Sequence, residues 1–308
     1  MLHKNAPRGC AERRNNMKIK EKLLDNKVHI SFEVFPPKTD AKFDSVLTAV
    51  DEISKLAPSF VSVTYGAGGG TSKNTVKIAS HIQNDFGVDS IAHLTCVSST
   101  KEEVRQRIRE MKEAGIQNIL ALRGDIPQDS AFPIPNQYKY AYELIEDIKA
   151  QGDFCIGAAC YPEGHVESAN KAEDIANLKR KVDAGVDFLT TQMFFDNNIL
   201  YNYLYRIREQ GITVPVVAGI MPITNPRQVE RAVELSGTYV PQRFKAIVDK
   251  FGHNPEAMKQ AGIAYATDQI IDLVANGVKA IHIYTMNKPD VAQAIRNNLS
   301  HIIGADQK

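Results

Sequence analysis

The sequence has few cysteines, almost no net charge and no long apolar run. Its four cysteines form no C-x-x-C pair and no zinc-like spacing, so they indicate reduced thiols in a cytosolic protein and argue against a disulfide framework. A net charge of +1 provides neither the basic surface that attracts nucleic acids nor a polybasic membrane segment. No stretch approaches the ~20 apolar residues that span a bilayer. These absences predict a cytoplasmic protein that acts on small molecules, with no nucleic-acid partner and no membrane partner.

Residues 1–16 carry lysines and arginines without an apolar core, which argues against a secretory signal. We expect a disordered tail there, or upstream sequence from a misplaced start codon. The first helical pattern follows at 19–24. With 43% hydrophobic and 24% charged residues, the chain has an ordinary globular composition. The length of the segment 17–308 fits one large α/β barrel or two smaller domains.

Strand and helix patterns alternate along this segment. The apolar strand candidates are 28–35, 60–65, 90–96, 118–123, 155–161, 187–192, 214–220 and 280–285. The helical candidates are 43–56, 72–85, 101–114, 138–150, 168–184, 197–210 and 226–236, then an insertion at about 241–276 and a terminal helix from 289. Such alternation predicts a parallel sheet. Eight units without a composition break predict one closed (β/α)8 TIM barrel, a single α/β domain with a helical insertion before the last strand.

Polar residues in these strands follow one phase of the strand alternation and gather toward the C-terminal ends. In a barrel of this type those ends form the mouth, where active sites lie. Polarity needed only for solubility would show no such register. The polar positions are Ser62 and Thr64, His93 and Thr95, Arg123 and Asp125, Tyr161, Thr190 and Gln192, and His282 and Tyr284, whereas 214–220 offers only apolar and small residues.

Glu33 lies inside an apolar run that Pro36 ends, and it shares a strand face with Ser31 and Phe35. A carboxylate in such a strand leaves water only if something binds it or uses it. Burial disfavours the charged form of a carboxylic acid, which suits a proton donor. The alternative is a structural ion pair with a lysine or arginine. The polar register of the other strands favours a catalytic acid.

Asp125 is the acid at the end of the fourth strand candidate. Two carboxylates in one mouth can divide the work as acid and base, or as acid and electrostatic tuner. Arg123 lies beside Asp125 in the sequence, so a structural ion pair between them is an equally good interpretation. No H-x-x-x-H, H-E-x-x-H or D-x-D cluster occurs, which argues against a metal centre.

Two further segments have features of phosphate binding. The glycine-rich loop 65–72 opens a helix but lacks both G-x-G-x-x-G and P-loop spacing, so a tight turn that allows close approach of a flat ligand is favoured. In the helical pattern 168–184, Asp174, Asn177 and Lys181 share one face and Arg180 adjoins it. A solvated charged face is the default interpretation of this pattern. A holder for a diphosphate and a ribose is the alternative.

A series of short segments occurs in order from about residue 29 to 297. They are SFEVFPP (31–37), VSVTYGA (61–67), AHLTC (92–96), ALRGD (121–125), ACYPEGH (159–165), LKRK (178–181), TQMFFD (191–196), GIMP (219–222) and YTMN (284–287). Several are loosely diagnostic alone, but together they closely resemble the methylenetetrahydrofolate reductase family, in its short bacterial form.

The resemblance implies a flavin barrel enzyme that passes hydride from NADH or NADPH to FAD and then to 5,10-methylenetetrahydrofolate. The reaction would be ping-pong at one shared site and would feed one-carbon metabolism and methionine synthesis. Glu33 would protonate the folate nitrogen and open the five-membered ring to an iminium, and Asp125 would tune the flavin and the folate. The implied FAD contacts are Thr64, His93, Arg123, Gly124, Asp125, Tyr140, Ala141, Tyr161, His165, Asp174, Asn177, Arg180 and Lys181. The implied substrate contacts are Thr64, Asp125, Gln192, Gln228 and Lys288.

Two positions depart from the family pattern. Ala232 stands where a bacterial relative has a Phe that stacks on the bound substrates. Lys288 replaces an Arg associated with the folate tail, so charge is kept while bidentate carboxylate recognition is lost. The bacterial pattern favours NADH over NADPH. We also expect a homo-oligomer, although no outer helix shows an uninterrupted apolar face that identifies the interface.

Two other interpretations compete with the reductase. A barrel lyase or aldolase acting on a phosphorylated substrate would need a Schiff-base lysine at a strand end, yet the nearest lysine, Lys279, only precedes the last strand. A pterin-binding partner subunit without its own redox activity is the second alternative. Intact Glu33, Asp125 and Gln192 argue against such a degenerate copy.

Overall fold

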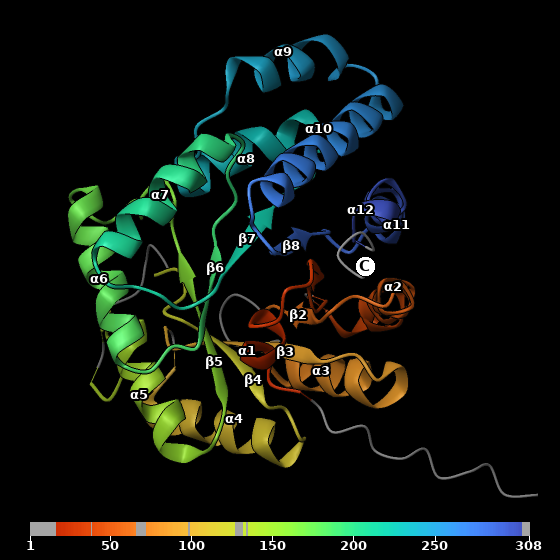
Figure 1. Ribbon diagram of the computed structural model, residues 1–308. Coiled ribbons are helices and arrows are strands. Elements are labelled where there is room, and N and C mark those ends of the chain that lie inside the picture. Colours follow the sequence, from red (N-terminus) through yellow and green to blue (C-terminus); the bar gives the residue numbers. More distant parts are fainter. Residues whose placement is uncertain are drawn as a thin grey trace, which may run out of the picture.

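Eight parallel strands close into a barrel, and helices surround it (Figure 1). This computed structural model describes residues 17–37, 39–65, 72–97, 99–126, 132–133 and 135–303. Each strand pairs with the next along the chain, and β8 pairs with β1 to close the ring. The (β/α)8 prediction is therefore confirmed. The predicted tail 1–16 and the glycines of the loop at 66–70 lie outside the described residues. The strands are β1 (His29–Val34), β2 (Val61–Val63), β3 (Ser90–Thr95), β4 (Asn118–Leu122), β5 (Cys155–Cys160), β6 (Phe188–Thr191), β7 (Val216–Ile220) and β8 (Ala280–Tyr284).

Several helices begin at a polar side chain that caps them. Asn170 accepts hydrogen bonds from the backbone N–H groups of Ala172 and Glu173, so α6 starts at Lys171 rather than at the predicted 168. Thr100 and Glu103 form a capping box that starts α4. The helices are α1 (Ile19–Leu23), α2 (Phe43–Ser54), α3 (Ser72–Phe86), α4 (Lys101–Glu113), α5 (Ala141–Gln151), α6 (Lys171–Asp183), α7 (Asn197–Glu209), α8 (Pro226–Ser236), α9 (Gln242–Phe251), α10 (Pro255–Ala275), α11 (Pro289–Asn298) and α12 (Ser300–Ile303), with a 3-10 turn η1 (Asp40–Lys42).

The main core lies between the barrel and the surrounding helices. Ile30, Phe32 and Val34 of β1 point outward into it and are buried, as the alternation of the strand predicts. The other face of β1, with Ser31 and Glu33, therefore points into the barrel.

The predicted insertion consists of α9 and α10, which pack with α8 around a small core of their own. Gly262 of α10 lies directly against the loop that follows β7. A Cβ at this position would sit 1.6 Å from the Ile223 carbonyl oxygen, so only glycine permits this approach. The contact fixes the loop from which α8 begins.

The interior of the barrel changes from apolar to polar along its axis. At the N-terminal end, Ile19 of α1 is fully buried against Phe60, Phe188 and Val217, and these residues form a floor. Polar side chains follow above this floor, toward the C-terminal ends of the strands. Among the described residues, no helix has the length and apolar character needed to cross a bilayer.

Candidate active site

A pocket of about 940 Å³ opens at the C-terminal ends of the barrel strands. Its volume lies near the upper end of the ~300–1,000 Å³ typical of cofactor and small-molecule sites. It brings together most of the residues that the sequence indicated. These are Glu33, Thr64, His93, Arg123, Gly124, Asp125, Tyr140, Ala141, Tyr161, His165, Asp174, Asn177, Arg180, Lys181 and Gln192.

The apolar part of the pocket wall was not predicted. Met193, Met221, Leu235 and Met286 line the pocket, as does Tyr142, which stacks on Tyr140 with ring centroids 5.6 Å apart. These residues lie in loops and helix ends beyond the strands, where strand alternation gives no signal.

Glu33 is buried in the pocket wall, with only 8% of its surface exposed. Its carboxylate oxygen Oε2 lies 3.7 Å from Nε2 of His93 and 3.8 Å from Nε2 of His282. It forms no ion pair with a lysine or arginine in the part of the chain that the structure describes. The structural ion pair considered as an alternative is therefore absent there, and two imidazoles flank the acid instead.

The hydrogen bonds around His282 define its tautomer. The Ser31 hydroxyl donates to the Ile281 carbonyl at 3.0 Å, so Ser31 Oγ accepts the N–H of His282 Nδ1 at 2.8 Å. In the neutral ring Nε2 then carries no proton, and it accepts the Ser62 hydroxyl at 2.9 Å. All three side chains are buried. The network therefore fixes the orientation of the His282 ring beside Glu33.

His93 is a second buried imidazole beside the acid, and it is 5% exposed. Burial lowers the pKa of His93 to about 4, outweighing the neighbouring Glu33, which raises it. The ring is thus neutral near pH 7. Its Nε2 is buried without a hydrogen-bond partner among the described residues, and an unpaired polar atom of this kind is characteristic of a functional position.

Arg123 does not pair with Asp125, the partner that their sequence positions suggested. Its guanidinium forms a bidentate pair with Glu167, with both N–O distances 2.6 Å. The pair raises the pKa of Arg123 and lowers that of Glu167. Asp125 lies exposed at the rim of the pocket. The ion pair between Arg123 and Asp125, one of the two interpretations of the sequence, is not formed, because the loop after β5 carries Glu167 to the guanidinium.

The polar face of α6 points into the pocket, so its interpretation as a solvated surface is wrong. Asp174 is buried, and burial raises the pKa of its carboxyl. Lys181 donates to the Ala159 carbonyl at 2.9 Å and lies 5.6 Å from the centre of the Tyr161 ring. Burial lowers the pKa of Lys181. A cation and a carboxyl thus lie together at this side of the pocket, beside His165.

Gln228 and Lys288 do not line the pocket, but one side chain connects them. Lys288 Nζ donates to Thr224 Oγ1 at 2.7 Å, and Thr224 Oγ1 donates to Gln228 Oε1 at 3.1 Å. Gln228 also completes the capping box of α8 with Asn225. Ala232 is 1% exposed and packs into the core of the insertion. That position therefore presents no side chain to the pocket.

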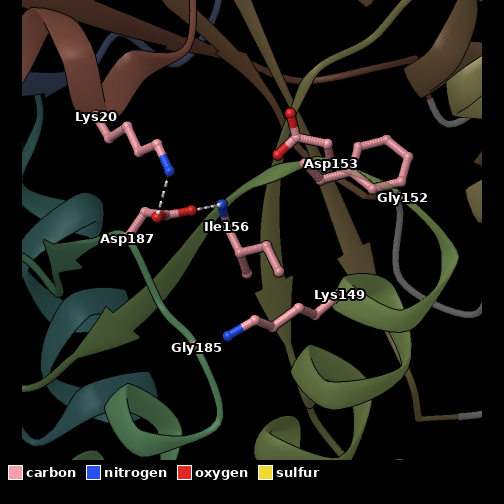
Figure 2. A pocket seen from close by; sticks show the side chains of 8 residues that line it. Lys20, Lys149, Gly152, Asp153, Ile156, Gly185 and Asp187 are labelled. Carbon is pink, nitrogen blue, oxygen red and sulfur yellow. Dashed lines mark hydrogen bonds and ion pairs between the residues drawn. The ribbon is translucent and has the colours of Figure 1, made fainter.

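A smaller pocket of about 450 Å³ lies at the opposite, N-terminal end of the barrel. Figure 2 shows Lys20 and the Ile156 backbone N–H both reaching the carboxylate of Asp187, at 3.0 and 2.9 Å. These bonds attach α1 to the strands. The Asp187 carboxylate is thus used in structural bonds to Lys20 and Ile156, and this pocket does not include Glu33.

Two absences bear on the alternatives. Across the described segments, no group of three or more His, Cys, Asp or Glu residues could hold a metal ion. None of the eight described strands contains a lysine, so no strand offers a Schiff-base nucleophile for a lyase or aldolase.

Comparison with protein families places these residues in context. The family described as Methylenetetrahydrofolate reductase matches residues 18–300, which is almost the whole described chain. The chain belongs to the methylenetetrahydrofolate reductase family. It is therefore an enzyme that reduces methylenetetrahydrofolate, and neither alternative is favoured.

Relatives support this membership over most of the chain. The 5,10-methylenetetrahydrofolate reductase of Pectobacterium carotovorum subsp. carotovorum is 36% identical over 276 residues, covering 90% of this chain and 91% of the relative. The Escherichia coli (strain K12) protein of the same name is also 36% identical, covering 90% and 92%. Methylenetetrahydrofolate reductase (NADH) 1 of Zea mays is 38% identical, and the match covers 93% of this chain but 51% of the relative. The resemblance to the short bacterial form is thus confirmed.

A solved structure supports the fold. An uncharacterized Clostridium thermocellum protein that binds two copies of 5-methyl-5,6,7,8-tetrahydrofolic acid superposes with a TM-score of 0.60 at 15% identity. The match covers 91% of this chain and 98% of that one. At such low identity the likeness concerns the barrel alone.

Proposed function

We propose that the pocket binds FAD and reduces methylenetetrahydrofolate with electrons from a reduced nicotinamide, and that Glu33 is the general acid. The observation that carries the proposal is the placement of Glu33, a buried carboxyl in the pocket wall between the imidazoles of His93 and His282. Folate reduction needs a proton donor at the ring nitrogen, and a positioned acid contributes roughly 10²–10⁴-fold in rate.

Several features of the pocket fit FAD. The volume is large enough for an extended ligand. One side offers the unpartnered Nε2 of buried His93, and another offers Lys181, Asp174 and the stacked Tyr140. Arg123, Gly124, Ala141, Tyr161, His165, Asn177 and Arg180 complete the proposed contacts. When bound, FAD supplies the hydride acceptor and donor, a chemistry that no side chain provides.

The protein residues would act on the folate as follows. Glu33 donates its proton to the folate nitrogen, the bond from that nitrogen to the methylene carbon breaks, and an iminium forms on the substrate. The ring of His93, whose Nε2 lies 3.7 Å from Glu33 Oε2, would lie beside the carboxylate that results. Asp125 at the rim would place negative charge near the pterin, and Gln192 and Thr64 would orient it.

Glu33 must regain one proton in each turnover. The chain from Ser62 through His282 and Ser31 ends on the Ile281 carbonyl, which has no proton to pass on. Proton return would therefore occur through the pocket opening. Because nicotinamide and folate would use the same pocket in turn, the kinetics would be ping-pong. NADH as the donor, a homo-oligomeric assembly and a cytoplasmic location are parts of the same proposal.

The first test of the proposal is the colour of the purified protein. We expect yellow protein whose visible absorbance bleaches with NADH or NADPH and returns with methylenetetrahydrofolate. A colourless protein that takes up no added FAD would refute the proposal.

The second test replaces the acid alone. Glu33→Gln should still bleach with nicotinamide, but its reoxidation by methylenetetrahydrofolate should slow by roughly 10²–10⁴-fold. Glu113→Gln, at an exposed position of α4, serves as the control and should match the parent. Parent-like folate reduction by Glu33→Gln would exclude Glu33 as the acid.

A further inference from the structure

The turn between β8 and α11 has an unfavourable backbone conformation. The Lys288 N–H donates to the Thr285 carbonyl at 3.0 Å, which closes a four-residue turn. Its two central residues, Met286 and Asn287, both have φ of 54°. Positive φ at both central positions is the pattern of a type I′ turn, which strongly favours Asn and Gly. Asn287 tolerates this conformation, but Met286 does not share that preference.

Hydrogen bonds attach this turn to the segment that follows β1. Asn287 Oδ1 accepts the Phe35 N–H at 2.8 Å, and Asn287 Nδ2 donates to the Phe35 carbonyl at 2.9 Å. The Thr285 hydroxyl donates to the Glu33 carbonyl at 2.7 Å. The turn that carries Met286 is therefore fixed to the backbone of the proposed acid and of its neighbour in the pocket wall.

Burial does not account for the position of Met286. Its surface is 39% exposed, and it belongs to none of the three hydrophobic clusters of the described residues. It lines the pocket together with Glu33 and Phe35. An unfavourable backbone conformation that is not offset by core packing is typical of a functional position. The side chain is also suited to a contact with a ring, since the methionine thioether is flexible and polarisable.

We infer that Met286 contacts the pterin ring of the folate substrate and that Asn287 is the positioning residue that holds it there. The folate is selected over the nicotinamide because the turn is bonded to the Glu33 segment, and Glu33 acts on the folate. The inference rests on the proposed function and adds a binding determinant to it.

The test separates folate affinity from fold stability. Met286→Gly removes the side chain and relieves the backbone, because glycine adopts positive φ readily. We expect its melting temperature to equal or exceed that of the parent. The apparent Kd for methylenetetrahydrofolate in the reoxidation half-reaction should rise about 3- to 10-fold, the range of a sulfur–aromatic contact. The apparent Kd for NADH in the reductive half-reaction should stay within about 2-fold of the parent.

Two further variants sharpen the result. Asn287→Gly keeps the backbone conformation accessible but removes both amide bonds to Phe35, so folate affinity should fall although Met286 is retained. Asn136→Gly is the matched control, because Asn136 also has positive φ (64°), is exposed and lies outside the pocket lining. It should leave both affinities unchanged.

The outcomes distinguish the inference from the proposed function. Parent protein that fails to bleach with nicotinamide or to reoxidise with folate would overturn both. An active parent, combined with unchanged folate affinity in Met286→Gly, would overturn the inference alone. A lower melting temperature of Met286→Gly with unchanged folate affinity would show that the turn has only a structural role.

Discussion

Replacing His93 with glutamine is expected to make the protein more resistant to acid. In the native protein, burial lowers the pKa of His93 to about 4, whereas an imidazole in an unfolded chain has a pKa of about 6.5. Between these values the unfolded chain binds a proton that the folded chain does not bind. The free energy of unfolding therefore decreases as the pH falls through 6.5, and the loss is complete below about 4.

The size of the effect follows from the two pKa values. Between pH 7 and pH 5, His93 should remove about 2 kcal/mol from the free energy of unfolding. At an unfolding entropy of about 2.1 cal/mol/K per residue, this corresponds to about 3 °C in melting temperature for a chain of 308 residues. The His93→Gln variant has no imidazole at this position, so its melting temperature should fall about 3 °C less than that of the parent between pH 7 and pH 5.

The assay is thermal unfolding at pH 7 and pH 5, followed by circular dichroism. His253→Gln, at an exposed position between α9 and α10, is the control for the loss of any imidazole, and it should keep the acid sensitivity of the parent. If His93→Gln loses as much melting temperature as the parent, then His93 is not a buried neutral imidazole, and the description of the acid's surroundings fails.

Three further predictions concern other parts of the fold. Gly219→Ala would place a Cβ 2.4 Å from both the Thr191 carbonyl oxygen and the Tyr284 hydroxyl, so we expect a loss of about 1–3 kcal/mol of stability, measurable by denaturant unfolding. An unchanged unfolding midpoint would contradict that packing. Gln228→Ala removes the Oε1 that accepts the Thr224 and Asn225 backbone N–H groups at the start of α8, so we expect a loss of about 1 kcal/mol of stability by denaturant unfolding. An unchanged unfolding midpoint would contradict this capping role. In a Cys10→Ser background, the buried thiols of Cys96, Cys155 and Cys160 should react with Ellman's reagent only after unfolding, because burial raises the pKa of each to about 12. Fast labelling of the folded protein would refute this prediction.

The barrel and the inward face of its strands could be predicted because both follow local rules. Alternation within a strand places Glu33 and Ser31 on one face of β1, and the parallel pairing brings them opposite Tyr284 and His282 of β8. Neither conclusion requires knowledge of a distant contact. This is why the inward position of Glu33 could be predicted from the sequence, whereas its two imidazole neighbours were not predicted.

The features that were not predicted depend on how the loops and helices pack against the barrel. The partner of Arg123 is Glu167, which the sequence does not place because the loop after β5 has no periodic pattern. The rotation of α8 decides that Ala232 faces the core of the insertion and that Gln228 caps the helix. The role of α1 as a floor was also missed, since a short amphipathic helix gives no indication of its docking site.

The floor has a consequence for the order of events in catalysis. Ile19 is buried in the floor at the N-terminal end of the barrel, so among the described residues the pocket beside Glu33 opens at the C-terminal ends of the strands. If the proposed ping-pong reaction with a nicotinamide is right, oxidised nicotinamide would depart along the path by which folate arrives. An excess of either reactant should then slow the binding of the other at this shared opening, and the kinetic sign would be mutual substrate inhibition.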